Sequence, residues 1–264
     1  MQQTDTAPLL PGVTRLFRKE LMEARRSKRA LTFVLIMTGI LLLIPLIGFF
    51  RLDSLGDGPR RLVSDEDMEG MVVAWSGILA YIGSLMVIAS TVDAMTQERA
   101  LGVTAWIVTK PVSRLSYLVA KAAGHAAVSA VTVVAIPTAV WLLVMTVTFS
   151  DLPYALVAWA VVIMCVEVLF LSFCVVALGV PLRAVVWIAL VSLGLWFIPT
   201  AVPAISSLEW TYRVLPSYLP FAVIMASVSE DATDSAVFTL AVASLATAGI
   251  VFLGASILFE RQEL

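Results

Sequence analysis

Residues 93–121 read DAMTQERALGVTAWIVTKPVSRLSYLVAK, a long segment of mixed polarity between two hydrophobic runs. Charged side chains stand toward both ends, and residues 100–108 form a block rich in apolar side chains. The block is typical of a short amphipathic helix, which ends before Lys110-Pro111 because the residue before a proline is pushed out of the α region. We expect a short helix held between two membrane spans, with a face that a partner outside this chain can bind.

The composition places the chain among membrane proteins. Of its 264 residues 60% are hydrophobic and only 14% are charged, whereas soluble domains carry about 25% charged residues. The net charge of −2 and the lack of a basic domain argue against a nucleic-acid partner. Two cysteines and one histidine, scattered along the chain, predict no metal site.

Six hydrophobic runs are each long enough to cross a membrane, since a helix rises about 1.5 Å per residue and the hydrocarbon is about 30 Å thick. The runs cover residues 31–50, 71–92, 122–149, 153–180, 184–205 and 236–259. Pro181 lies between the fourth and fifth runs and predicts a tight turn there. We therefore expect an all-α polytopic membrane protein with one transmembrane domain over residues 1–264.

Residues 13–30 precede the first run and combine apolar residues at helical spacing with many basic ones. This pattern predicts an amphipathic elbow helix that lies on an anionic lipid surface. The alternative is a charged flank of the first span. The basic residues that we expect at the membrane surface are Arg15, Arg18, Lys19, Arg25 and Arg26.

The basic residues also predict the orientation of the spans. Thirteen of the 17 Lys and Arg residues fall in the N-terminal segment, in residues 93–121, at Arg183 and at Arg261. Loops rich in Lys and Arg stay on the cytoplasmic side. We therefore expect both termini and residues 93–121 in the cytoplasm, and residues 51–70 and 206–235 outside.

Sequence motifs for catalysis are absent from the chain. It contains no G-x-x-x-x-G-K-[ST] phosphate loop, no H-E-x-x-H and no G-x-S-x-G. We expect no catalytic residue, and the chain by itself is not predicted to be an enzyme.

Glu167 is the only ionisable residue deep within a predicted span. A carboxylate at the bilayer centre costs on the order of 3 kcal/mol, so this side chain should face the bundle interior, a partner or water. It could contact cargo or a proton in a translocation path. It could equally be a protonated structural acid that is hydrogen-bonded to a hydroxyl such as Ser192 or Thr138.

The chain resembles ABC transporter permeases of the ABC-2 type, the transmembrane subunits of exporters, over essentially its whole length, and the best local match is the region from Asp93 to His125. The order of residues is loosely similar to that of the permease that serves maturation of nitrous oxide reductase. The elements that carry the resemblance are Glu98, Gly102, residues 106–108, Pro111, Lys121 and Gly124-His125.

The resemblance implies that residues 93–121 form a coupling loop, which docks on a separate ABC ATPase subunit that binds ATP and magnesium. It also implies a second permease copy, identical or homologous, no cofactor on this chain, and a place in a prokaryotic plasma membrane. The expected coupling residues are Glu98, Arg99, Leu101, Gly102, Ala105 and Val108. Two alternatives are a proton-coupled secondary carrier that uses Glu167, and a membrane anchor or assembly subunit without transport.

The predicted topology can be tested with single cysteines at Ser64, Ser113 and Ser229 in a chain that lacks Cys165 and Cys174. An impermeant thiol reagent applied to intact cells should label positions 64 and 229 only, because position 113 is predicted to be cytoplasmic. Labelling at position 113 would contradict the six-span arrangement.

Overall fold

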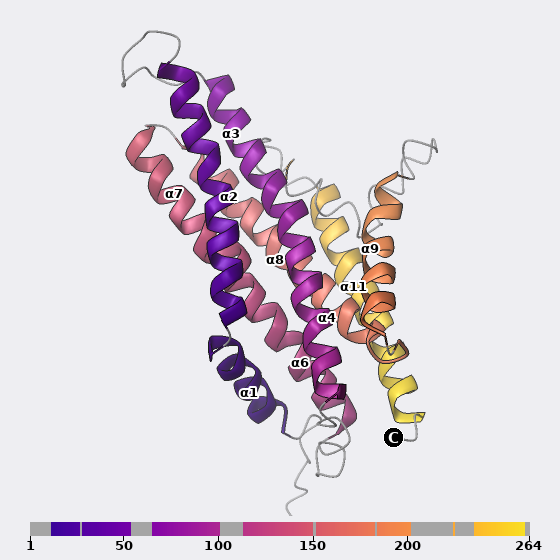
Figure 1. Cartoon of the computed structure of the whole chain (residues 1–264). Helices are drawn as coiled ribbons and strands as arrows, with labels where there is room; N and C mark the ends of the chain where they lie inside the picture. The colour runs from indigo at the N-terminus through magenta and orange to yellow at the C-terminus, as the bar shows by residue number, and fades with distance from the viewer. Residues whose placement is uncertain are drawn as a thin grey trace, which may run out of the picture.

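The computed structural model describes residues 12–26, 28–53, 65–100, 113–149, 152–182, 184–201, 224 and 235–261. Within these ranges the chain is helical and contains no strand. Figure 1 shows the helices side by side in an elongated bundle. The all-α class predicted from the hydrophobic runs is therefore confirmed.

In the described part of the chain, five helices are long and apolar enough to cross a membrane. A sixth, α9, is apolar but has only 17 residues. The helices are α2 (Lys28–Asp53), α3 (Asp65–Ile78) continuing through η1 (Leu79–Gly83) into α4 (Ser84–Ala100), α6 (Arg114–Ser129) continuing through η2 (Ala130–Ala135) into α7 (Ile136–Thr148), α8 (Tyr154–Leu178), α9 (Val185–Ala201) and α11 (Ser235–Arg261). Together they show a multi-pass membrane protein.

The helices around residues 93–121 extend further than the sequence predicted. Residues 93–100 continue α4, so this helix extends beyond the predicted end of the second hydrophobic run at residue 92. Residues 114–121 form the first turns of α6, where Ser113 caps the helix by accepting a hydrogen bond of 3.0 Å from the Ser116 N–H. Residues 101–112 lie outside the described residues.

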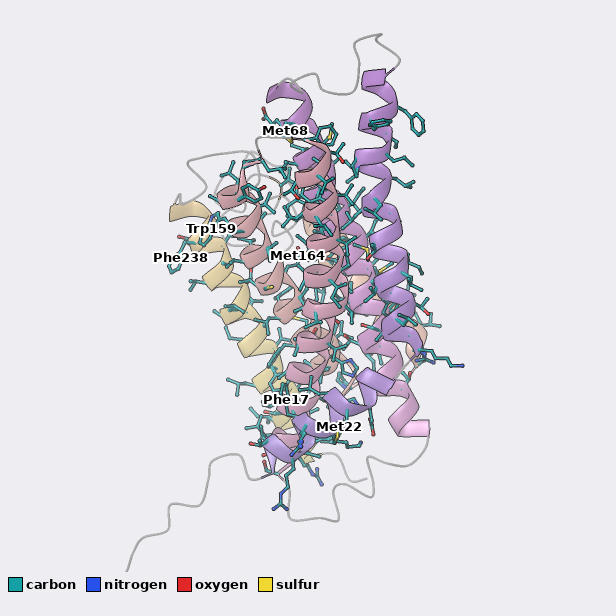
Figure 2. The ribbon with its side chains drawn as sticks, turned by 90° about the vertical axis from the view of Figure 1, so that its left-hand side faces the viewer. Phe17, Met22, Met68, Trp159, Met164 and Phe238 are labelled. Carbon is teal, nitrogen blue, oxygen red and sulfur yellow. The ribbon has the colours of Figure 1, made fainter. Side chains whose placement is uncertain are left out.

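Two of the long helices change their pitch in the middle of the bundle. The π-helical segments η1 and η2 interrupt the second and third spans and contact each other. A Cβ added at Gly83 in η1 would lie 3.1 Å from Met164 Cε and 3.2 Å from Val133 Cγ1, so three spans meet closely at this point. Figure 2 shows Met164 about midway along the bundle. Such π-helical turns are frequent at functional sites.

Helix α8 occupies the centre of the bundle and contacts α4, α6, α9 and α11. The second and third spans are joined by Trp75 and Trp141, which are fully buried and stack with ring centroids 5.0 Å apart. Stacked aromatic rings of this size bury much apolar area and favour one relative position of their helices.

A shorter helix, α1 (Val13–Arg26), lies at one end of the bundle and packs along α6. The end of α11 at the C-terminus lies at this same end, which we call the α1 end (Figure 1). Phe17 and Met22 of α1 stand there in Figure 2, whereas Met68 stands toward the opposite end. The first described helix and the C-terminal end of the last one therefore lie at the same end of the bundle.

Replacing Trp141 by Ala should lower the stability of the purified protein by about 3–5 kcal/mol, because it removes a fully buried ring and leaves a cavity. The matched control is Trp187→Ala, since Trp187 is 61% exposed on α9. Thermal unfolding in detergent should give a clearly lower midpoint for the first variant and a near-unchanged midpoint for the second. Equal midpoints would show that the stack does not hold the two spans together.

Candidate functional site

Glu167 lies at a junction of three helices in the middle of the bundle. Its side chain, on α8, has no exposed surface. Its Oε1 accepts a hydrogen bond of 2.5 Å from Ser84 Oγ, at the start of α4, and one of 3.2 Å from Trp196 Nε1 of α9. One carboxyl oxygen thus joins α4, α8 and α9 at the level where η1 ends.

The sequence prediction that this acid faces the bundle interior agrees with its complete burial, but the hydroxyls named as its partners are wrong. Ser84 is the hydroxyl donor, because α8 packs on α4 and α9 at this level. On α9 the indole of Trp196 donates, one turn beyond Ser192. Ser192 Oγ and Thr138 Oγ1 are buried without a hydrogen-bond partner among the described residues.

The second carboxyl oxygen of Glu167 differs from the first in its hydrogen bonding. Glu167 Oε2 is buried and has no hydrogen-bond partner in the described part of the chain. An ionised carboxylate at this depth is costly, and the two donors on Oε1 are both neutral groups. Oε1 therefore accepts two hydrogen bonds, whereas Oε2 keeps an unused capacity for hydrogen bonding.

A second cluster of charged side chains lies at the α1 end, between α1 and α6. Glu20 of α1 is close to Lys121 and His125 of α6: its Oε1 lies 3.6 Å from Lys121 Nζ and its Oε2 lies 3.7 Å from His125 Nε2. Lys121 and His125 belong to the segment that carries the family resemblance, whereas Glu20 was not predicted as a site residue. The signal was present, because Glu20 falls four residues after Leu16 on the apolar face of the predicted helix.

The five residues predicted at the membrane surface belong to α1. Arg15 and Arg18 are exposed, and Lys19 pairs with Glu23 of the same helix at 3.4 Å. The side chains of Arg25 and Arg26 lie outside the described residues. Binding of this basic surface to lipid stays a prediction.

The predicted coupling residues fall in the region that the structure describes least. Glu98 and Arg99 belong to the last turn of α4, at the α1 end, and their side chains lie outside the described residues. Leu101, Gly102, Ala105 and Val108 are also outside the described part. Their role therefore stays a prediction.

The described residues contain no cluster of three or more His, Cys, Asp or Glu side chains that could hold a metal ion. The polar groups at mid-depth are instead one acid, hydroxyls and indoles. These groups can donate and accept hydrogen bonds, and they can make a packed interface sensitive to small shifts of its helices.

A comparison with protein families finds one match that covers most of the chain. The model described as "ABC-2 family transporter protein" matches residues 60–258. The match includes the Glu167 junction and the segment between α4 and α6, whereas α1 and α2 precede it. No curated protein matches the chain.

The Glu167 junction yields a prediction for a pair of variants. Glu167→Leu should destabilise the protein by about 1–3 kcal/mol, because the indole N–H of Trp196 then loses its acceptor in a buried place. Glu167→Gln is the matched control, since its amide oxygen can accept from both Ser84 and Trp196. Reversible unfolding in mixed detergent should show a loss for Leu and near-wild-type stability for Gln; equal stability of all three proteins would contradict a bonding role.

Proposed function

The chain belongs to the ABC-2 family of transporter proteins, and from this premise we propose that it is the transmembrane subunit of an ATP-driven exporter. The permease forms the path across the membrane, and a separate ABC ATPase subunit supplies the energy. Two permeases and two ATPases make the complete transporter, with ATP and magnesium bound by the ATPase subunits. The protein works in a prokaryotic plasma membrane, with its α1 end in the cytoplasm.

One observation carries the coupling part of this proposal. Helices α4 and α6 reach the two sides of residues 101–112 and continue, through η1 and η2, into long membrane spans. The span that begins at Arg114 has 35 residues, or about 50 Å of helix. Because the hydrocarbon is only about 30 Å thick, this rigid rod can extend outside the membrane and transmit displacement of the segment to the bundle interior.

The contact with the ATPase is proposed to involve the turn that ends α4 and the segment after it. Glu98 and Arg99 make charge-assisted contacts with the ATPase, and Leu101, Ala105 and Val108 form the apolar face that it covers. Gly102 allows a close approach of the two backbones. A patch of this size depends on a few anchoring residues, so single substitutions should have large effects.

The Glu167 junction supports a role in the two states of the path. A transporter alternates between two conformations. ATP can shift the equilibrium between them only if the ATP-bound ATPase interacts with the two conformations with different free energies. Helices α4, α8 and α9 meet at one carboxyl oxygen, so a shift of α4 must lengthen or replace the bond from Ser84. The spare capacity of Glu167 Oε2 offers a partner for a rearranged helix or for cargo.

The same acid supports a second candidate function, a proton-coupled secondary carrier. A fully buried carboxyl group with an unused oxygen is the feature that such a carrier would need. The two functions differ in their energy source. Export that continues after the co-purifying ATPase is inactivated would favour the carrier.

Leu101→Asp tests the coupling contact, because it places an unpaired charge in an apolar interface, at a cost of several kcal/mol. The tagged permease should insert normally but retain little ATPase subunit after purification. The rate of MgATP hydrolysis by the purified material should therefore fall by about tenfold or more. The matched control is Val103→Asp, which lies about 200° around the predicted helix from Leu101.

The control variant should retain the ATPase subunit, because its added charge points away from the predicted contact face. If Leu101→Asp keeps a full complement of bound ATPase and wild-type MgATP hydrolysis, residues 93–121 are not the contact, and the exporter proposal loses its main physical support.

A further inference from the structure

The contact between α1 and α6 includes charged side chains that the proposed function does not use. Glu20 Oε1 lies 3.6 Å from Lys121 Nζ, and Glu20 Oε2 lies 3.7 Å from His125 Nε2. The Lys121 side chain is only 2% exposed and that of Glu20 is 11% exposed. One carboxylate of α1 thus faces two basic side chains that are one helical turn apart on α6.

Gly124 lies between these two basic residues and brings the helices unusually close. A Cβ added at Gly124 would stand 2.7 Å from the Cβ of Glu20. That atom belongs to the stem of the side chain and cannot swing away, so α1 itself would have to move. The glycine therefore forms the recess into which Glu20 fits, and it fixes where α1 sits along α6.

The remaining contacts at this end extend the attachment to α11. Leu16 of α1 packs against a buried apolar cluster that includes Tyr117 of α6 and Phe259 of α11. The Arg114 guanidinium donates a hydrogen bond to the Phe259 carbonyl and lies 5.6 Å from the centre of its ring. The first turns of α6, which follow residues 101–112 directly, hold both α1 and the end of α11.

We propose that Glu20 is a positioning residue that fastens α1 to α6, so that α1 is displaced together with α6 when the ATPase moves residues 101–112. This inference rests on the proposed function. A surface ion pair would be too weak for such a task. A buried pair is different, because separating its members removes an ion pair in a place that water barely reaches.

The ion pair Lys19–Glu23 lies within α1 and can be compared with the ion pair between Glu20 and Lys121. Its side chains are 39% and 58% exposed, and both belong to α1. It can help the helix to form but cannot attach it to α6. Glu23→Gln is therefore the matched control for Glu20→Gln, since both variants remove one carboxylate charge from α1.

The test uses the full chain with its co-purified ATPase in nanodiscs, with spin labels in a chain that lacks its two native cysteines. One label pair joins Arg18 of α1 to Tyr154 at the far end of α8, both exposed positions. A second pair joins Ser113, before α6, to Tyr154. Distances are measured without nucleotide and after trapping with MgATP and vanadate.

In the otherwise native sequence we expect both distances to shift on trapping. Glu20→Gln should abolish the shift of the Arg18 label while the Ser113 label still moves, and Glu23→Gln should leave both shifts intact. The double variant Glu20→Lys with Lys121→Glu should restore the first shift. Gly124→Ala, which preserves every charge, should also abolish it.

The same variants are examined in the permease without ATPase by amide hydrogen exchange. Glu20→Gln should reduce the protection of α1 by about tenfold or more, because a helix of 14 residues is marginal without tertiary contacts. An unchanged protection and an unchanged Arg18 shift in Glu20→Gln would overturn the proposal. Reduced protection with the Arg18 shift intact would also overturn it, since α1 would then move without this contact.

The two labels separate a failure of this inference from a failure of the proposed function. If neither label moves on trapping in the native sequence, the coupling function itself is wrong, and α1 carries no displacement. If, in the native sequence, the Ser113 label moves and the Arg18 label does not, the coupling function stands and the proposed role of Glu20 is refuted.

Discussion

The packing at the α1 end of the bundle depends on the long helix that begins at Arg114. The helix Arg114–Thr148 has 35 residues, more than one crossing of the hydrocarbon needs, and Arg114, Lys121 and His125 lie in its first turns. A helix end that carries such side chains can hold other elements by ion pairs and hydrogen bonds. This is what α6 does with Glu20 of α1 and with the last turns of α11.

The middle of the bundle follows a different rule, because polar groups there must be satisfied inside the protein. Ser84, Glu167 and Trp196 satisfy one another across three helices, while Glu167 Oε2 and Ser192 Oγ are left without partners among the described residues. The π-helical segments η1 and η2 meet at the same level. Close packing, incomplete hydrogen bonding and altered helix pitch thus coincide at one level of the bundle.

Much of this architecture could be predicted from hydrophobic runs alone, because their length and the position of Pro181 define the helices. The burial of Glu167 could also be predicted, since a carboxylate cannot face lipid cheaply. Its partners could not, because they depend on how α9 rotates against α8, and Trp196 reaches further than Ser192. Glu20 was missed for a similar reason. An acid on the apolar face of α1 can be identified as a contact residue only when the position of Lys121 opposite it is known. The limits of α4 and α6 were misjudged because hydropathy marks the edge of the hydrocarbon and not the end of a helix.

The central claim is that residues 101–112 of this membrane protein contact an ABC ATPase. It is tested most directly by a photo-reactive amino acid placed at Trp106, followed by irradiation of living cells and mass spectrometry of the adduct. The account predicts a covalent adduct with an ABC ATPase subunit, and none when the same amino acid is placed at Ser64. An adduct with the ATPase from position 64, or none from position 106, would contradict it.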